Sequence, residues 1–314
     1  MKLITNTLIN SLPISYAEYV KWAEDAFKLK QQTILPPKIS IKLEQNIFFN
    51  TMPCYLPFYK RIGVKMVSRY PKRIPSLISE ILLWDSETGE CLALMSGDWI
   101  TAFRTGAVAS LTIKKLQATN TGIYAFVGLG NTARSTLLCL LSIQPEIQHQ
   151  VRILKYKDQA DNFIKRFKSY TNVTFEIVNT KEELVEGADV IVSCVTAMDE
   201  IFAPINLYKE GVLVVPIHTR GFQNCDLHFD KIIGDDYEHI KEFEYFSRFK
   251  YFTEFSNVLN GNDPGRQNPK EKILAYNIGI ALQDVYFASK IYDYLQHEKI
   301  KSISLDHPKE KFWI

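Results

Sequence analysis

The sequence has few cysteines, and none are grouped in a way that would bind a metal or build a disulfide framework. The five residues are scattered and never spaced as C-x-x-C: Cys54, Cys91, Cys139, Cys194 and Cys225. This spacing argues against a zinc ribbon and against a disulfide scaffold. We therefore expect a protein of the reducing cytoplasm with no bound metal.

The chain also lacks a marked excess of charge and any long apolar run. Lys+Arg 37 against Asp+Glu 35 leaves a net charge of +2, which argues against a nucleic-acid partner. No stretch reaches the roughly 18 uncharged apolar residues of a membrane helix, and the N-terminus has too short an apolar core for a signal peptide. We expect no membrane partner, and 314 residues suggest two domains of roughly 150 residues each.

The first third of the chain combines amphipathic helices with short strands. Residues 14–30 repeat aromatic and small apolar side chains at three- and four-residue steps, which predicts a helix. Residues 78–95 predict a hairpin that turns at 85–89, where Gly89 can supply a positive φ. Residues 99–117 predict a second long helix.

From residue 122 onward, predicted strands and helices alternate. The strands are expected at 122–130, 151–157, 173–178, 188–195, 212–218 and 231–236, and the helices at 131–143, 160–170 and 279–295. Such alternation implies βαβ units and a parallel sheet. The aromatic segment 242–255 has helical spacing with interleaved glutamates, which favours core packing over stacking on nucleic-acid bases.

A glycine-rich turn joins the first of these strands to its helix. Gly128–Ala133 fits G-x-G-x-x-A, in which Gly128 permits the tight turn and Gly130 lets the backbone approach a pyrophosphate. The small Ala133 allows helix and strand to pack closely, and free N–H groups at the helix start would hold phosphates. We predict a dinucleotide site that includes Asn131 and Thr132; the alternative is a glycine-rich turn of another α/β fold.

The end of the second strand bears on the choice between NAD and NADP. An acidic residue there would bind the ribose 2′-OH, whereas a basic one would suit a 2′-phosphate. Lys155 and Lys157 favour NADP, and Asp158 would serve NAD if the strand ends later. The alternative is that all three are solvated charges at a strand end, so the expected cofactor is NAD or NADP.

Several short motifs resemble one enzyme family. Thr101–Ala107 reads T-x-x-R-T-x-A about 20 residues before the glycine turn, which resembles the ornithine cyclodeaminase/μ-crystallin family. Other similar pieces follow in the family's order: Met52-Pro53, Gly63-Val64-Lys65, Glu186–Ile191, Gly261–Arg266 and Gly279–Asp284. The resemblance implies a Rossmann-type doubly wound parallel sheet with an α+β domain for substrate binding and homodimer formation. We expect residues 118–275 to form the dinucleotide-binding domain, and 1–117 with 276–314 the other.

The resemblance also implies hydride transfer at the Cα–N bond of an amino acid. Such a reaction leaves an iminium, so the enzyme must fix the α-carboxylate and manage protons. Arg104 is the expected carboxylate anchor because guanidinium binds carboxylates bidentately; without the resemblance, it would be interpreted as a helix-surface arginine. Lys65 shares a strand face with Gly63 and Val67, so it could be desolvated and act as the acid/base. Without the resemblance, a lysine on the wet face of an edge strand would be the better interpretation.

Further site residues are implied by the same resemblance. The expected substrate contacts are Lys38 and Met52, although lysine cannot supply the planar fork of the family's arginine at the first position. The expected additional cofactor contacts are Thr105, Thr196, Asn277 and Gly279, and Asp284 is expected to help close the site.

The sequence departs from the family after the predicted strand 212–218. Cyclodeaminases have an aspartate there in a longer loop, whereas here the nearest acid is Asp226, our second catalytic candidate. A similar shortened loop occurs in the branch that makes 2,3-diaminopropionate, and Asn277 also resembles that branch. His218 and Arg220 would then contact a larger acidic substrate, or His218 would simply be a hydrogen-bonded strand-end residue. Cys225 is expected to be a small buried hydrophobe rather than a nucleophile.

Two classes of function follow. The first is an NAD(P)-dependent enzyme that is either ornithine cyclodeaminase-like or a net amino-acid dehydrogenase, N-substituted amino-acid dehydrogenase or imine reductase. The alternative is a non-catalytic protein of the μ-crystallin kind that binds NADP and a small ligand.

Overall fold

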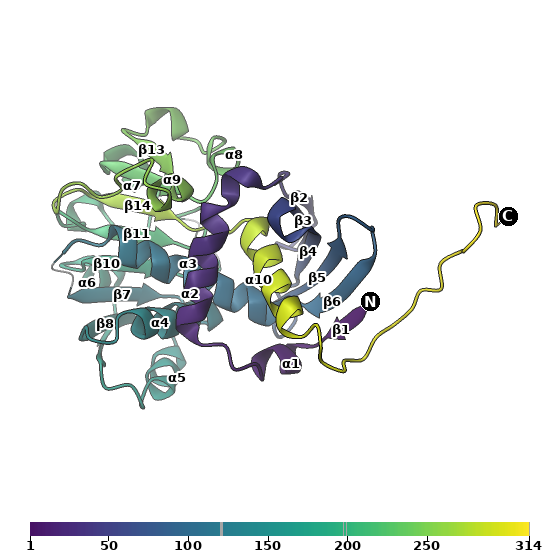
Figure 1. Cartoon of the computed structure of the whole chain (residues 1–314). Helices are drawn as coiled ribbons and strands as arrows, with labels where there is room; N and C mark the ends of the chain where they lie inside the picture. Colours follow the sequence, from purple (N-terminus) through teal and green to yellow (C-terminus); the bar gives the residue numbers. More distant parts are fainter. Residues whose placement is uncertain (120–121, 197, 199, 314) are drawn as a thin grey trace. The chain divides into compact units, whose positions relative to one another are not determined.

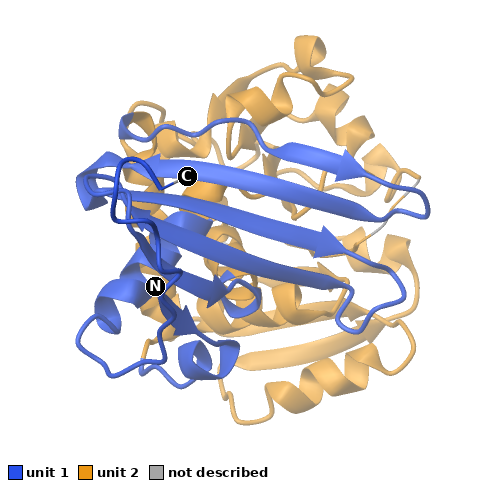
Figure 2. Ribbon diagram, turned by 90° about the vertical axis from the view of Figure 1, so that its right-hand side faces the viewer, with its two compact units in different colours: residues 1–13, 32–100, 284–314 blue, residues 14–31, 101–283 orange. Residues whose placement is uncertain are grey.

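The chain forms two compact units, which Figure 2 shows in different colours. The computed structural model describes residues 1–119, 122–196, 198 and 200–313. Unit 1 comprises Met1–Pro13, Gln32–Ile100 and Asp284–Ile314, and unit 2 comprises Ile14–Gln31 and Thr101–Gln283. The predicted domain limits lie at 117/118 and 275/276, and the predicted ranges include residues 120–121, 197, 199 and 314, which lie outside the described residues. The roles predicted for the two domains remain predictions.

Unit 1 is built on a six-stranded mixed sheet (Figure 1). Its strands, in spatial order, are β1 (Lys2–Ile4), β6 (Cys91–Ser96), β5 (Leu77–Asp85), β4 (Arg61–Arg69), β3 (Phe48–Leu56) and β2 (Ile39–Lys42). Strands β1 and β6 pair in parallel, and the pairs β6–β5, β5–β4, β4–β3 and β3–β2 are antiparallel. The predicted hairpin is confirmed, because β5 pairs with β6 and Gly89 has φ 73° in the turn between them. The helices are α1 (Asn6–Asn10), the short η2 (Pro57–Tyr59) and most of α10 (Ala281–Tyr294).

The two faces of this sheet differ in burial. Alternate residues along β3, β4 and β5, such as Cys54, Gly63 and Leu83, are buried. Their neighbours on the opposite face, such as Val64 and Leu82, are apolar yet only half-buried. The edge strand β2 adds Ile39 and Ile41 to that second face, and both are more than half exposed.

Unit 2 is built on an eight-stranded sheet in which every neighbouring pair is parallel. The spatial order is β13 (Phe252–Glu254), β12 (Lys231–Gly234), β14 (Ile273–Tyr276), β11 (Leu213–Pro216), β10 (Val190–Ser193), β7 (Ile123–Val127), β8 (His149–Leu154) and β9 (Val173–Val178). The central strands are buried along their whole length, as expected for a sheet covered on both faces. The predicted doubly wound parallel sheet is therefore confirmed.

The helices of unit 2 include both long N-terminal ones. They are α2 (Tyr16–Lys28), α3 (Asp98–Leu116, from Thr101 on), α4 (Asn131–Ile143), α5 (Gln159–Arg166), α6 (Lys181–Val185), α7 (Gln223–His228), α8 (Tyr237–Ile240) and α9 (Phe255–Leu259). Short 3-10 turns lie at η1 (Lys30–Gln32), η3 (Ile205–Leu207) and η4 (Phe246–Arg248). Helix α2 belongs here because Phe27 packs edge-on against Phe255. Just after the helix, Lys30 of η1 forms ion pairs with Asp236 and Glu254.

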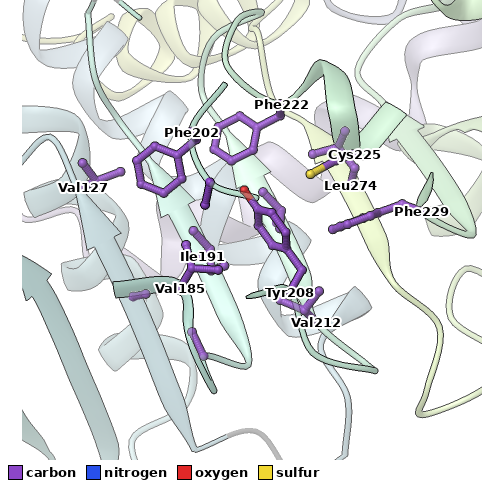
Figure 3. Packing of buried hydrophobic residues seen from close by; sticks show 14 of the residues in the cluster. Val127, Val185, Ile191, Phe202, Tyr208, Val212, Phe222, Cys225, Phe229 and Leu274 are labelled. Atoms are coloured by element: carbon purple, nitrogen blue, oxygen red, sulfur yellow. The ribbon is translucent and has the colours of Figure 1, made fainter. Parts of the chain in front are cut away.

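A hydrophobic cluster fills one side of this sheet, with Phe202, Phe222, Phe229 and Tyr208 among its members (Figure 3). The aromatic segment 242–255 packs against it, which confirms core packing. The segment contains η4 and β13 and ends at Phe255, the first residue of α9. Its phenylalanines recur every three residues from 243 to 252, and successive i to i−3 backbone bonds follow the same period. That spacing is typical of 3-10 turns rather than of an α-helix.

None of the helices in the described ranges has the length and apolar character needed to cross a bilayer. No cluster of potential metal ligands is found among the described residues either.

Candidate active site

The residues predicted to bind a dinucleotide follow the strands of unit 2 at one edge of the sheet. Gly128 follows β7, Lys155 follows β8, Thr196 comes after β10 and Asn277 follows β14. Because all these strands are parallel, their carboxyl ends lie at the same edge. The chain order reverses between β7 and β10, and ligands of open α/β sheets bind at such a switch point.

The two glycines of the turn differ in what a side chain at each position would contact. Gly128 has φ +78°, and a Cβ there would lie 2.6 Å from the backbone of Cys194 and of Val195. Gly130 caps the N-terminus of α4 without any side-chain cap, and a Cβ there would meet nothing within 4 Å. The start of α4 is thus open to a ligand, and uncapped N–H groups with the helix dipole fit the phosphates of a dinucleotide.

The remaining predicted cofactor residues lie around this turn. Asn131 is exposed and Thr132 is half-buried in the first turn of α4, while Ala133 is fully buried as close packing requires. Lys155 and Lys157 are exposed immediately after β8. The carboxylate of Asp158 accepts a hydrogen bond from Asn162 Nδ2 at 2.9 Å, so it is engaged at the start of α5. The first two charged side chains after β8 are therefore basic.

The T-x-x-R-T-x-A motif packs helix α3 against helix α4. A Cβ on Gly106 would lie 2.5 Å from the backbone carbonyl carbon of Ser135, and the Ser135 hydroxyl donates to the carbonyl oxygen of Ala102 at 2.7 Å. Thr105 uses its hydroxyl within α3, donating to Thr101 O at 2.6 Å. The motif therefore fixes the helix that carries Arg104 to the helix that begins at the glycine turn.

Arg104 itself is buried, with its guanidinium against the backbone of Gly279. A Cβ on Gly279 would collide with Arg104 Nη1, and Gly279 also has φ +84°. Gly279 and Asn277 belong to the turn that follows β14. The carboxylate of Asp235, at the end of β12, accepts hydrogen bonds from both of these residues. Asp235 is not among the residues predicted from the sequence, although two adjacent aspartates after a buried strand were a usable signal.

Unit 1 holds Lys65 in its interior. Strand β4 lies between β3 and β5, so Lys65 faces Met52 and Ile81 across the ladder. Lys65 Nζ donates to Asp284 Oδ1 at 2.9 Å, and the two side chains are 2% and 0% exposed. A Cβ on Gly63 would lie 2.6 Å from Val285 Cγ1, so this glycine lets α10 approach β4 closely enough for the ion pair.

The surroundings of this ion pair are apolar. Met52 is buried beside Lys65, and burial together with the Asp284 charge raises the pKa of the Cys54 thiol to about 12. Lys38, in contrast, is exposed just before β2.

Asp226, the second predicted catalytic residue, follows β11 in the chain. Asp226 lies on α7, where it is buried and accepts a hydrogen bond from the Tyr276 hydroxyl at 2.9 Å. Burial raises its pKa to about 7, although the bond from Tyr276 opposes the rise. Its neighbour Cys225 belongs to the hydrophobic cluster, and burial raises the pKa of the thiol well above its ordinary value.

His218 is hydrogen-bonded at the sheet edge. Its Nε2 lies 2.7 Å from Ser193 Oγ, at the end of the neighbouring strand β10. Burial lowers the pKa of His218 to about 4, so the ring is neutral at neutral pH. Arg220 is exposed in the following turn.

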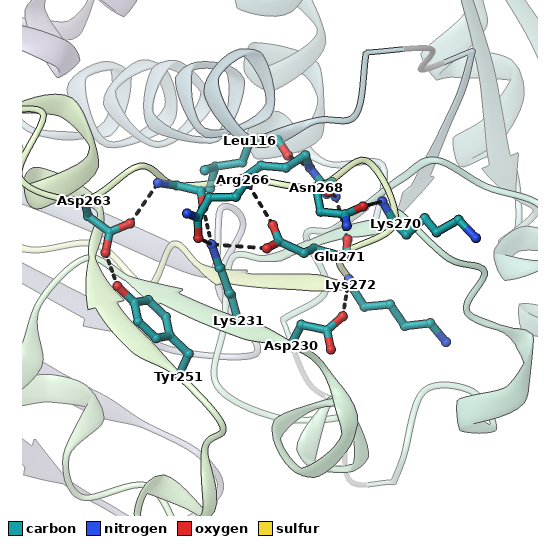
Figure 4. Close-up of polar contacts among 12 residues, drawn as sticks. Leu116, Asp230, Lys231, Tyr251, Asp263, Arg266, Asn268, Lys270, Glu271 and Lys272 are labelled. Carbon is teal, nitrogen blue, oxygen red and sulfur yellow. Dashed lines mark hydrogen bonds and ion pairs between the residues drawn. The ribbon is translucent and has the colours of Figure 1, made fainter.

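The motif Gly261–Arg266 takes part in a network of polar contacts that joins several elements of unit 2 (Figure 4). Arg266 Nε donates to the carbonyl oxygen of Leu116 at 2.6 Å, which satisfies the C-terminal end of α3. Lys231 Nζ donates to the carbonyl oxygen of Gly265 at 2.6 Å and pairs with Glu271. The motif thus fastens the loop before β14 to α3 and to β12.

An all-parallel sheet with an open glycine turn at its switch point defines unit 2 as a Rossmann-type dinucleotide-binding fold. The chain belongs to the ornithine cyclodeaminase/mu-crystallin family, whose model matches residues 5–299.

Curated relatives and solved structures extend over most of the chain. Nodulation efficiency protein NfeD of Rhizobium meliloti is 27% identical over 271 residues, with 82% of this chain and 83% of the relative covered. Alanine dehydrogenase of Archaeoglobus fulgidus is 25% identical, with 93% and 94% covered. The Thermococcus litoralis Δ1-pyrroline-2-carboxylate reductase in complex with NADH and L-proline is 25% identical with a TM-score of 0.84, and 96% of this chain and 100% of that chain are covered.

One further relative concerns the branch suggested by the shortened loop. N-((2S)-2-amino-2-carboxyethyl)-L-glutamate dehydrogenase of Staphylococcus aureus is 22% identical over 257 residues, with 77% of this chain and 75% of the relative covered.

Proposed function

We propose that this protein is an NAD(P)-dependent enzyme that transfers a hydride at the Cα–N bond of an amino acid, or reduces the corresponding imine. The strongest support in the structure is the interior ion pair of Lys65 and Asp284. A buried ion pair is weak as a source of stability, because desolvation offsets most of its attraction. A lysine held next to a carboxylate in an apolar setting is, however, well suited to exchange a proton with a substrate. Membership of the family and its named relatives support the same class of reaction.

The proposed roles follow the placement of each residue. Arg104 binds the α-carboxylate, Lys65 moves the proton and Asp284 stabilises its charged form. Lys38 and Met52 remain candidate substrate contacts, and Asp226 a candidate for proton handling. The dinucleotide is held by the glycine turn and by the other predicted cofactor contacts: Thr105, Gly128, Gly130, Asn131, Thr132, Ala133, Lys155, Lys157, Thr196, Asn277 and Gly279. When bound, its nicotinamide supplies the hydride acceptor or donor.

We favour net oxidation or reduction over cyclodeamination. Cyclodeamination needs a group that orders water or the side-chain amine, and the acid nearest the family position is Asp226. Its carboxyl group accepts a hydrogen bond from the Tyr276 hydroxyl next to a hydrophobic cluster. His218 is neutral at neutral pH because burial lowers its pKa. An alanine dehydrogenase and a pyrroline-2-carboxylate reductase among the relatives support this choice.

Absorbance of the reduced nicotinamide tests this proposal. The purified full chain is incubated with NAD+ or NADP+ and a panel of amino acids and N-carboxyalkyl amino acids, with ammonia measured in the same wells. Net reduced cofactor is expected. Ammonia from ornithine without net reduced cofactor would instead establish cyclodeamination.

Two lysine variants separate an enzyme from a ligand-binding protein. We expect Lys65→Met to abolish turnover while cofactor binding is retained. Lys231→Met is the matched control, because Lys231 is a second buried, ion-paired lysine of the chain. It should lower stability without abolishing turnover. Turnover that survives in Lys65→Met would contradict the catalytic role.

We also propose that the protein is a homodimer of the cytoplasm and that unit 1 forms the interface. One face of its sheet is apolar and half-buried within a single chain, with Ile39, Ile41 and Ile62 at least 40% exposed. A face of this kind usually meets a partner. Sedimentation of the wild type and of Val64→Glu measures this: a dimer is expected for the first and a monomer for the second.

A further inference from the structure

A carboxylate is buried at the end of β12 and bonds the turn that packs against the Arg104 guanidinium. Asp235 directly follows the strand and is 1% exposed. Its neighbour Asp236 pairs with Lys30 at 3.1 Å, so the two adjacent carboxylates serve different partners. The role of Asp235 therefore differs from that of Asp236.

Asp235 holds both ends of the turn that follows β14. Its Oδ2 accepts the backbone N–H of Gly279 at 2.6 Å, and its Oδ1 accepts Asn277 Nδ2 at 3.3 Å. A carboxylate can only accept hydrogen bonds, so the amide group of Asn277 must face it with nitrogen. The Asn277 oxygen then points elsewhere: Oδ1 is buried and has no hydrogen-bond partner among the described residues.

The same turn packs against Arg104. A Cβ on Gly279 would collide with Nη1, so the backbone of Gly279 lies close against the guanidinium and the positions of the two depend on each other. Burial raises the pKa of Asp235 to about 6, and the charges of Arg104 on α3 and Lys30 on η1 oppose that rise. Both hydrogen bonds from the turn are donated to Asp235, as its ionised form requires.

We propose that Asp235 is a positioning residue for the substrate anchor. It fixes Gly279 against the Arg104 guanidinium, and it orients Asn277 so that Oδ1 is presented to an N–H donor of a bound ligand. This inference rests on the proposed role of Arg104 as carboxylate anchor. The N–H group belongs either to the amino or imino nitrogen of the substrate or to the carboxamide of the nicotinamide.

A swap of the two side chains tests the pairing. In Asp235→Asn, the new amide nitrogen faces the nitrogen of Asn277, so the Asn277 amide must turn over. In the double variant Asp235→Asn/Asn277→Asp, the bond is restored in the opposite sense and residue 277 still offers an acceptor. Asp263→Asn is the matched control, since Asp263 is another buried aspartate that accepts a glycine N–H, from Gly265 at 2.8 Å.

The readouts are KM and kcat for the substrate found in the panel, and the dissociation constant of the reduced cofactor measured by its fluorescence. We expect Asp235→Asn to raise KM at least about 10-fold with kcat within about threefold, as lost ground-state binding should. The swap should recover most of that change, and Asp263→Asn should leave KM unchanged. If Asp235→Asn instead raises the dissociation constant of the cofactor and leaves KM unchanged, and the swap restores cofactor binding, the N–H group belongs to the nicotinamide.

Two results would overturn the proposal. In the first, Asp235→Asn has the same KM, kcat and cofactor dissociation constant as Asp263→Asn. In the second, the double variant has lost as much binding as Asp235→Asn alone. Arg104→Gln separates these from failure of the proposed function. If Arg104→Gln raises KM and Asp235→Asn does not, only the positioning role fails. If Arg104→Gln leaves KM unchanged, the anchor itself is wrong.

Discussion

Lys65 and Asp284 form an ion pair in the interior of unit 1, with 2.9 Å between Nζ and Oδ1. The lysine comes from the middle of a sheet and the aspartate from the C-terminal helix, 219 residues apart in the chain. Each charge is tolerated there because of the other.

The first prediction concerns this pair. Asp284→Asn leaves a buried ammonium without its carboxylate and should cost about 3–5 kcal/mol in the free energy of unfolding. The double variant Lys65→Met/Asp284→Leu replaces both charges by apolar groups and should recover most of that loss. It should nevertheless show no turnover. Urea unfolding and the nicotinamide assay measure the two effects, and a double variant that still turns over would refute proton transfer by Lys65.

A second prediction separates the two glycines of the dinucleotide turn. Gly130→Ala should fold normally, because its Cβ meets nothing, yet weaken NAD(P) binding at least about 10-fold by obstructing the pyrophosphate. Gly128→Ala should instead lower the free energy of unfolding by more than about 2 kcal/mol, because positive φ and a backbone collision act together. Fluorescence titration and urea unfolding distinguish them. Equal cofactor affinity in Gly130→Ala and the wild type would place the phosphates elsewhere.

The third prediction concerns the choice of cofactor. Lys155 and Lys157 are exposed after β8, and Asp158 is engaged by Asn162. Replacing both lysines by glutamine should weaken the binding of NADP+ about 10-fold and the binding of NAD+ less than twofold, since only NADP+ carries a 2′-phosphate. The NADP+ effect should shrink at high salt. Lys165→Gln, on the last turn of α5, is the control. A loss of equal size for both cofactors would show that these lysines do not read the 2′-phosphate.

A fourth prediction follows from the buried Asp226. Its pKa is raised from 3.8 to about 7 in the folded state. The folded protein therefore holds this proton more tightly than the unfolded chain, and the stabilisation is complete below about pH 4 and lost as pH rises to about 7. Asp226→Asn should flatten this part of the stability profile and stabilise the protein at pH 8. Urea unfolding between pH 4 and pH 8 measures it.

The same variant tests the predicted catalytic role of Asp226. If this residue serves stability alone, Asp226→Asn keeps its turnover within about threefold of the wild type. Turnover that falls by at least about two orders of magnitude, with the pH profile of stability unchanged, would instead support proton transfer.

The local elements of this fold and the parallel sheet of unit 2 could be predicted from the sequence, whereas the order of its later strands and the packing of separate segments could not. The predicted limits of helix α4 are the observed ones, because a glycine cap and an apolar stripe lie within one short segment. The position of β14 between β11 and β12, and the packing of α2 in unit 2, depend on contacts between residues far apart in the chain.

The candidate site shows the same division. Arg104, Lys65 and the glycine turn lie in short motifs that the sequence makes recognisable. Asp235 was missed, because its importance comes from a turn more than 40 residues further along the chain. The role of Gly106 was also invisible, since it depends on a neighbouring helix.

The place of β14 also has a consequence for biosynthesis. Strands β11 and β12 are synthesised before the strand that pairs with both of them, residues 273–276. Until then, the nascent chain presents two open, strongly apolar strand edges, which favour aggregation. Chains truncated before residue 273 should therefore be insoluble, and chaperones should bind the nascent protein most strongly between the synthesis of β12 and that of β14.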